Sequence, residues 1–454
     1  MASKLLDISI KMKFLKSVFL FVSIFIGLLN GAKADIISPS GQELSVTFAA
    51  SVFVPNGVLD NDYAIEAAIK LQLHHLVGAF QSPQFAASIG EKNIEDTGVI
   101  AVGPLASYSI QSREVVGTGV EVKYLASIEA LTQKDFATFD TQGHPRSIAL
   151  ILPHNPYSVY STACVSKDLT DRYSFFYNWN PYLPTCVKAE KAKNNNLDRV
   201  QALVSSVKPL PNDLKPNYEK ILSQAKTRDG EIRIATLLGY YEPNTIDRDS
   251  RDNFNAIYKQ LTKSEHFVQV ANLANTDLFA SPAKDKQPYV ELLRPATAVS
   301  PPIRLWLSLS FTKGPSPKVY ASRARFAIEK ADIVTYWGHS GLGRYLDFDW
   351  LSQQDEAGPI KMSGLYQIFF LQGCESFLHY SVPFSASGKS AVVTAGYTLF
   401  FGERAPEILE ILKTFYDDSL FGKRTWLDLL TAVEAAEAEQ GNISLINVSG
   451  ISSY

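Results

Sequence analysis

Residues 332–340 read DIVTYWGHS, and residues 366–374 read YQIFFLQGC. Each stretch is a short apolar run that leads through a small residue to one reactive side chain, His339 in the first and Cys374 in the second. Uninterrupted apolar runs of this length are typical of parallel strands buried on both faces of a sheet. If the two strands are neighbours, His339 and Cys374 leave the same edge of the sheet at one level, where sites form in such folds.

The sequence on either side continues an alternation of strands and helices. Further strands are expected at residues 231–240, 267–273, 305–311 and 391–395, and helices at 250–261, 317–331, 406–416 and 425–435. Thr425 is placed to cap the last of these helices. The alternation predicts an α/β fold for residues 229–454, with a mainly parallel sheet covered by helices on both faces.

The two strand ends resemble the signature of the caspase-like cysteine peptidases, which include caspases, metacaspases, legumains, gingipains and separases. In that family one apolar strand ends in His-Gly, and a later apolar strand ends in a small residue and Cys. Here Tyr336, Gly338 and His339 match the first site. Gly373 and Cys374 match the second site. An imidazole beside a thiol is the pairing that nucleophilic catalysis by cysteine needs.

The resemblance implies a caspase-like α/β/α sandwich over residues 229–454, with Cys374 as nucleophile and His339 as general base. Peptide bonds would be hydrolysed through a thioester acyl-enzyme, without a cofactor. The backbone amide of Cys374 would hold the oxyanion together with a second amide. Ser340 stands where the family usually has Gly, and Gly341 follows one place later. The second amide therefore stays open between Ser340 and Gly341.

Acidic residues close to the strand ends are candidates for a substrate pocket. Glu375 and Asp347 could favour a basic residue before the scissile bond, and solvated loop charges are the alternative interpretation. His379 could cluster with the two reactive residues, but the sequence holds no paired metal-ligand motif, so no metal is expected.

Two other functions fit parts of the sequence. The tripeptide Gly338-His339-Ser340 resembles the nucleophile elbow of lipase-type serine hydrolases, with Ser340 as nucleophile, but that motif needs Gly where Leu342 stands. The second alternative is an inactive exported protein that kept the caspase-like fold and binds a partner through the aromatic segment at residues 173–182. A local core beside a disulfide is the competing interpretation of this segment.

Residues 1–34 have the pattern of a secretory signal peptide. Basic residues precede an apolar run, and Ala32 and Ala34 supply small side chains for cleavage before Asp35. Met12 is expected to be the true start. Because the apolar run is short for a membrane span, we expect an exported protein, periplasmic or secreted from a bacterium, with no integral membrane span after processing.

The composition indicates a globular protein. The chain has 454 residues, of which 46% are hydrophobic and 20% charged, and its net charge of -3 offers no basic excess for nucleic-acid binding. The resemblance to caspase-like peptidases implies a peptide or protein substrate, and the oligomeric state stays open. Of the three cysteines, Cys164 and Cys186 can close a local disulfide in an oxidising compartment, which leaves Cys374 as the free thiol.

The first half of the chain is expected to be a separate domain. Residues 35–187 predict a mixed α+β domain, with strands at 44–54, 115–128 and 147–152 and a helix at 63–80. Gly117 and Gly119 are interpreted as bulges in the second of these strands. Residues 188–228 are rich in Lys, Asn and Pro and are expected to form a helical linker.

Overall fold

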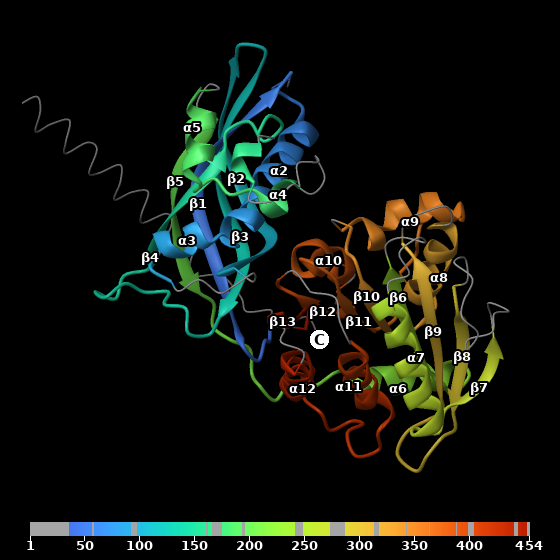
Figure 1. The fold of residues 1–454 in the computed structure, drawn as a ribbon. Coiled ribbons are helices and arrows are strands. Elements are labelled where there is room, and N and C mark those ends of the chain that lie inside the picture. Colours follow the sequence, from blue (N-terminus) through green and yellow to red (C-terminus); the bar gives the residue numbers. More distant parts are fainter. Residues whose placement is uncertain are drawn as a thin grey trace, which may run out of the picture.

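A computed structural model describes residues 36–56, 59–91, 98–159, 162–165, 175–192, 196–240, 248–272, 287–312, 317–341, 343–362, 364–386, 388–397, 404–439 and 444–451. Within these ranges, no helix combines the length and apolar character needed to cross a membrane. The expected signal peptide and its cleavage point before Asp35 lie outside the described residues. The described chain forms two lobes, each built on its own sheet (Figure 1).

The N-terminal lobe is a five-stranded antiparallel sheet with the order β2-β3-β1-β5-β4. Its strands are β1 (Gly41–Pro55), β2 (Ile100–Val116), β3 (Gly119–Gln133), β4 (Arg146–Pro153) and β5 (Leu197–Ser206). Along β1 every second side chain is buried, including Leu44, Val46 and Phe48. Helix α2 (Asp62–Phe80) covers this face with an apolar stripe, as the helical periodicity of its sequence predicts.

The predicted disulfide between Cys164 and Cys186 is present, with the two Cα atoms 4.4 Å apart. The short helices of this lobe are α3 (Pro83–Ser88), η1 (Thr162–Cys164), α4 (Phe175–Asn178) and α5 (Pro184–Ala192). Trp179 is fully buried in one cluster with both cysteines, and Tyr182 packs against it. Trp179 and Tyr182 of the aromatic segment therefore form a local core beside the disulfide, and residues 173–174 lie outside the described residues.

Two sequence-based expectations for this half of the chain are wrong. Residues 188–228 are not a helical linker, because they include β5, which pairs with β1 and β4, and helix α6 (Tyr218–Thr227). Gly117 is not a bulge within one strand: it adopts a left-handed φ of 57° in the turn of the β2–β3 hairpin, and Gly119 begins β3. Glycine tolerates this conformation, which a tight hairpin turn requires.

The C-terminal lobe is an eight-stranded sheet with the order β13-β12-β11-β10-β6-β9-β8-β7. Its strands are β6 (Ile232–Tyr240), β7 (Val268–Asn272), β8 (Tyr289–Arg294), β9 (Ile303–Phe311), β10 (Ile333–Gly338), β11 (Gln367–Gln372), β12 (Ser390–Ala395) and β13 (Ile446–Ser449). The run from β12 to β9 is parallel, whereas β13, β8 and β7 pair antiparallel at the two sides. The prediction of a sheet built around parallel strands is confirmed.

Helices cover both faces of this sheet and give a three-layer α/β arrangement (Figure 1). One face shares a core with α6, α7 (Arg248–Lys263), α11 (Ala405–Tyr416) and α12 (Trp426–Ala438). The other face shares a core with α8 (Pro317–Lys330), α9 (Phe348–Asp355) and α10 (Ser376–Ser385). The central strands are buried along their whole length between these layers, which explains their uninterrupted apolar sequences.

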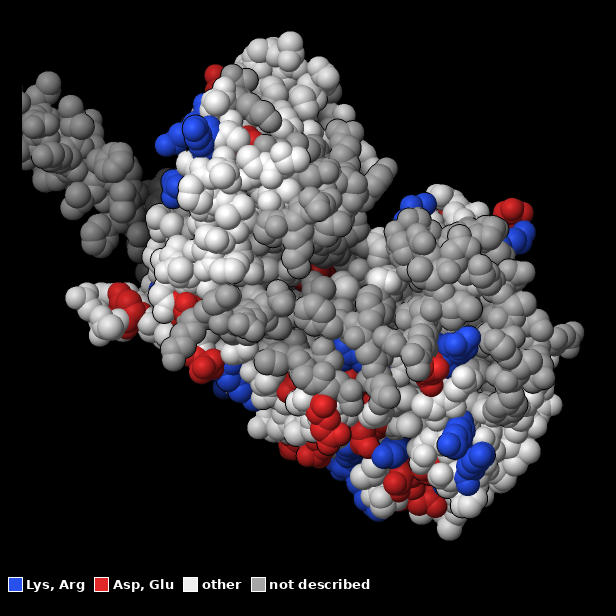
Figure 2. All heavy atoms as spheres, viewed as in Figure 1, with Lys and Arg blue, Asp and Glu red and all other residues white. Residues whose placement is uncertain are grey.

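The two lobes meet along a packed seam. Ile37 pairs with Val448 of β13 through two backbone hydrogen bonds of 3.0 and 2.9 Å, so the first described residues join the C-terminal sheet. Beside this pairing a small apolar cluster draws residues from both lobes: Ile36, Ala101, Leu131, Phe377, Tyr397 and Leu445. Among the described residues on the face in Figure 2, basic and acidic side chains are interspersed.

Candidate active site

Strands β10 and β11 are parallel neighbours, as the sequence predicts. Their register pairs Trp337 with Gln372, and both strands therefore end at the same level of the sheet. His339 and Cys374 each follow their strand two residues beyond this pair. Helix α9 lies in the connection between the strands. The two reactive residues thus emerge from adjacent strands at the carboxyl edge, which is where α/β sheets place their sites.

Glycines let the backbones at this edge approach closely. Gly338 has a φ of 156°, and a Cβ atom at this position would lie 2.4 Å from the carbonyl oxygen of Gly239 on β6. A Cβ atom on Gly373 would lie 3.0 Å from the carbonyl oxygen of Gly338 and 3.3 Å from the amide nitrogen of Ser340. A larger residue at Gly338 would push the histidine segment away from β6, and a larger residue at Gly373 would push apart the segments that carry the histidine and the cysteine.

The Tyr336 hydroxyl lies between the two halves of the site. It donates a hydrogen bond to the backbone carbonyl of His339. Burial is the main reason why the pKa of Tyr336 is raised, and the Cys374 thiol lies close enough to add an electrostatic contribution in the same direction. The buried Tyr336 hydroxyl therefore holds the histidine segment by a hydrogen bond and lies within electrostatic reach of the Cys374 thiol.

The exposure of the reactive side chains differs. His339 and Cys374 are both partly exposed, and Cys374 stands outside the disulfide that joins Cys164 and Cys186. Ser340 is only 2% exposed. Its carbonyl accepts hydrogen bonds from the Tyr380 hydroxyl (3.0 Å) and from the Tyr345 amide (3.2 Å), so the segment is held from two sides. A serine nucleophile at the end of a strand needs an accessible hydroxyl, which a buried Ser340 does not offer.

The two acidic residues expected near a substrate pocket have different surroundings. Glu375 is 1% exposed, has a left-handed φ of 53°, and accepts a hydrogen bond of 2.5 Å from the Gln81 side chain of the N-terminal lobe. Asp347 is exposed, caps α9 by accepting from the Trp350 amide, and lines the cavity described below. Asp347 therefore lies where a substrate could contact it, whereas Glu375 takes part in the contact between the two lobes.

Several polar residues at this edge are not predicted by the sequence motifs. Arg404 and Glu407 form a buried ion pair of 2.7 Å at the start of α11, and the Arg404 guanidinium lies 4.7 Å from the centre of the Trp337 ring. Gln372 is 2% exposed, and within the described part of the chain both polar atoms of its side chain lack a hydrogen-bond partner. Buried polar groups left in this state often mark functional sites. The only signal in the sequence was one polar residue at the end of an apolar run.

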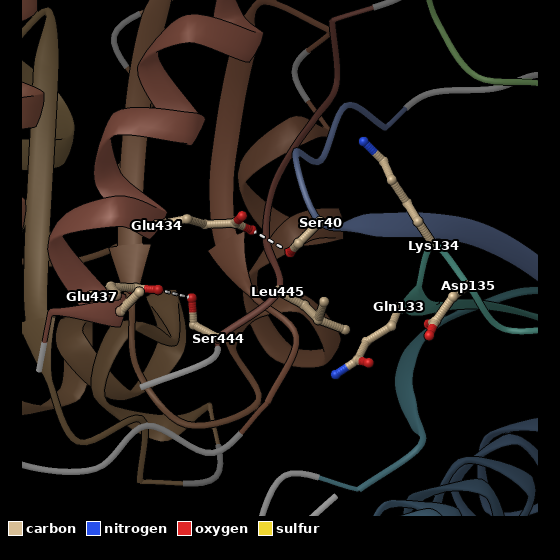
Figure 3. A pocket seen from close by; sticks show the side chains of 9 residues that line it. Ser40, Gln133, Lys134, Asp135, Glu434, Glu437, Ser444 and Leu445 are labelled. Atoms are coloured by element: carbon tan, nitrogen blue, oxygen red, sulfur yellow. Dashed lines mark hydrogen bonds between the residues drawn. The ribbon is translucent and has the colours of Figure 1, made fainter. Parts of the chain in front are cut away.

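Two cavities lie near the seam. The larger, of about 860 Å³, is lined by α2 and β2 of the N-terminal lobe and by α10 and residues 343–347 of the C-terminal lobe. The smaller, of about 460 Å³, lies between the ends of β1 and β3 and helix α12, and it is lined by Glu434 and Glu437 (Figure 3). In the described ranges, no group of three or more His, Cys, Asp or Glu side chains could hold a metal ion.

No protein-family model, curated protein or solved structure matches this chain. The resemblance to caspase-like peptidases therefore depends on the two strand-end motifs and on their placement at neighbouring strands of one sheet.

Proposed function

We propose that this chain is an exported cysteine endopeptidase with a caspase-like α/β domain, in which Cys374 is the nucleophile and His339 the general base. One observation carries the proposal. The strands that precede the two residues are parallel neighbours whose register brings both residues to one level of the carboxyl edge. A thiol and an imidazole placed in this way can act on one bound carbonyl group.

The reaction follows from these roles. His339 takes the thiol proton as the Cys374 sulfur attacks the carbonyl carbon of the peptide bond, and the carbonyl oxygen becomes an oxyanion. Backbone amides of Cys374 and of Ser340 or Gly341 would stabilise this charge. The C–N bond breaks, and the amine leaves with the proton from His339. Water, deprotonated by His339, then hydrolyses the thioester and restores the thiol.

The alternatives have weaker support in the described residues. A serine hydrolase needs an accessible Ser340, and this side chain is buried. A partner-binding protein would present its aromatic segment, but Trp179 in that segment is fully buried beside the disulfide. Neither alternative uses the pairing of β10 with β11.

The experiment is a panel of thiol-reactive peptide probes and fluorogenic peptides with acidic, basic and apolar residues before the scissile bond. Cys374→Ala should abolish labelling and hydrolysis while costing at most about 2 kcal/mol of stability, because it removes little volume. His339→Ala should lower turnover about 10²–10⁴-fold. The exposed His144, far along the sequence in the N-terminal lobe, provides the control: His144→Ala should behave as wild type.

Ser340→Ala separates the two hydrolase mechanisms. In the cysteine mechanism Ser340 offers only its backbone amide, so we expect turnover within about tenfold of wild type. Full loss of turnover in Ser340→Ala with retention in Cys374→Ala would refute the cysteine mechanism in favour of the serine one. A wild type that hydrolyses no peptide and takes up no probe would refute peptidase activity altogether.

A further inference from the structure

The larger cavity is formed by both lobes and is lined by elements that follow the candidate active-site residues in the chain. Helix α10, which begins two residues after Cys374, supplies Leu378, His379 and Val382 to one wall. The segment that follows His339 reaches the same wall, because a Cβ atom on Gly343 would lie 3.0 Å from the imidazole of His379. Both segments that carry the reactive residues therefore lead to this cavity, although His339 and Cys374 do not themselves line it.

The opposite wall comes from the N-terminal lobe. It includes Leu73 and His74 of α2 and the stretch of β2 at residues 102–108. The lobes touch at Gly103, where a Cβ atom would lie 2.6 Å from the ring of Phe377 on α10. This contact sets how closely the two walls approach, so the cavity is a defined cleft and its width depends on the seam. A volume of about 860 Å³ is within the usual range of ligand sites.

The cleft wall formed by β2 includes backbone N–H and C=O groups as well as side chains. β2 is an edge strand of the described sheet, with β3 as its neighbour. Its pairing with β3 is irregular between Val102 and Leu105 and again between Leu105 and Ser107. Edge strands present unpaired N–H and C=O groups, which extended peptides use to add a strand to a sheet.

The chemistry of the cleft suits an apolar peptide segment. Aliphatic side chains such as Leu105, Ile128 and Val382 form the apolar part of the wall, and Val382 is 52% exposed. Charged side chains of both signs also line the cleft: Glu66, Lys70, Arg344 and Asp347. The rings of His74 and His379 lie 6.1 Å apart across the two lobes. Burial lowers the pKa of His74 to about 4 and that of His379 to about 3, so both rings are neutral and each can donate one hydrogen bond and accept another.

We propose that this cleft between the lobes binds an extended, mainly apolar segment of the substrate polypeptide, adjacent to the scissile bond. The inference rests on the proposed function, because it takes the occupant to be the substrate of the site at Cys374. The N-terminal lobe then contributes directly to substrate selection: β2 lies beside the peptide backbone, and α2 and α10 receive its apolar side chains.

The test measures binding separately from hydrolysis. The probe is a fluorescein-labelled peptide of about ten residues, rich in Leu, Val and Ala, since an apolar segment should fill the aliphatic cleft. Its binding to Cys374→Ala is followed by fluorescence polarisation, and hydrolysis of fluorescein-labelled casein is followed in the wild-type background.

Ala106→Trp, at an exposed position of the cleft wall, fills the cleft, and Val382→Lys places a charge on the other wall. Ser109→Trp, exposed on the same strand outside the cleft, is the matched control.

We expect Ala106→Trp and Val382→Lys each to weaken peptide binding about tenfold or more, and Ser109→Trp to leave it unchanged. Alkylation of Cys374 by iodoacetamide should proceed at the wild-type rate in the cleft variants, which shows that the site remains folded. Unchanged binding in both cleft variants, or no binding at all, would overturn the inference even if casein is hydrolysed. Binding that depends on the cleft, in a protein that hydrolyses neither casein nor any peptide of the panel and takes up no probe, would keep the cleft as a peptide-binding site but overturn both the peptidase activity and the assignment of the bound segment as its substrate.

Discussion

A buried carboxyl group in the smaller cavity should make the stability of the protein depend on pH. Glu437 of α12 is 1% exposed; one of its oxygens accepts a hydrogen bond from Ser444, and the other is buried and has no partner among the described residues (Figure 3). Burial, and secondly the nearby Glu407, raise the pKa of Glu437 from 4.5 to about 8. The folded state therefore holds this proton more tightly than the unfolded state does.

The sign of the effect follows from linkage. A carboxyl group with a raised pKa in the folded state contributes its full stability below about pH 4.5, and this contribution is lost as the pH rises to about 8. We expect the free energy of unfolding to fall across this interval in wild type and to fall less in Glu437→Gln, whose amide carries no proton to lose. Urea unfolding at a series of pH values measures this. Glu219→Gln, at an exposed site on α6, is the control, and equal slopes in all three proteins would contradict the assignment.

At the level of elements, the sequence predicts the buried strands best. β10, β11 and β12 are buried on both faces, so their sequences are apolar without interruption and their bounds were predicted to within one or two residues. The N-cap Thr425 was also predicted, and it forms a capping box with Asp428. These features depend on local sequence alone.

Several strands and helices were not predicted, and the local sequence of each explains why. Much of β2 is exposed, and its pairing with β3 is irregular, so neither alternation nor an apolar run marks it. β5 combines polar residues with a single buried face and lies in a stretch rich in Lys and Asn. α10 contains Pro383 and begins after Glu375, which has a left-handed backbone conformation. Each of these elements is stabilised by contacts with distant parts of the chain.

One such contact joins helices from the two lobes beside Cys374. Gln81, the C-cap of α2, donates to Glu375, the N-cap of α10. Gln81→Leu keeps much of the volume but removes the donor to a buried carboxyl group, so we expect a loss of about 1–3 kcal/mol in stability. Because Glu375 follows Cys374 directly, we also expect a lower kcat with little change in KM for short peptides, and partial rescue in Gln81→Asn.

Unfolding in urea and steady-state kinetics measure both effects. Gln111→Leu is the control, since Gln111 is exposed on β2 and hydrogen-bonds only locally to Ser109 among the described contacts. If Gln81→Leu lowers stability but leaves kcat unchanged, the contact supports the seam without positioning the cysteine segment.

For the whole molecule, the seam is the part of the structure that sequence patterns could not predict. Leu131 of β3 illustrates why. Its neighbours Ala130 and Thr132 are buried against the lobe's own core or backbone, yet Leu131 is also fully buried, because the C-terminal lobe covers the outer face of the strand there. Burial of consecutive residues breaks the strand alternation, and its cause is packing against Phe377, Tyr397 and Leu445, which lie far along the chain in the C-terminal lobe.

The seam gives the last prediction, that Leu131→Ala uncouples the lobes. Leu131 belongs to the cluster shared by both lobes, whereas Leu150 of β4, equally buried, belongs to the core of the N-terminal lobe alone. Each Leu→Ala change should cost about 2–5 kcal/mol of stability.

Only Leu131→Ala should also speed amide hydrogen exchange across the seam at Phe377, Tyr397 and Leu445, as measured by mass spectrometry. Because the walls of the cleft are held by this seam, the same variant should raise KM for long peptides more than Leu150→Ala does. Equal exchange at these residues in the two variants would show that the lobes do not depend on this cluster for their arrangement.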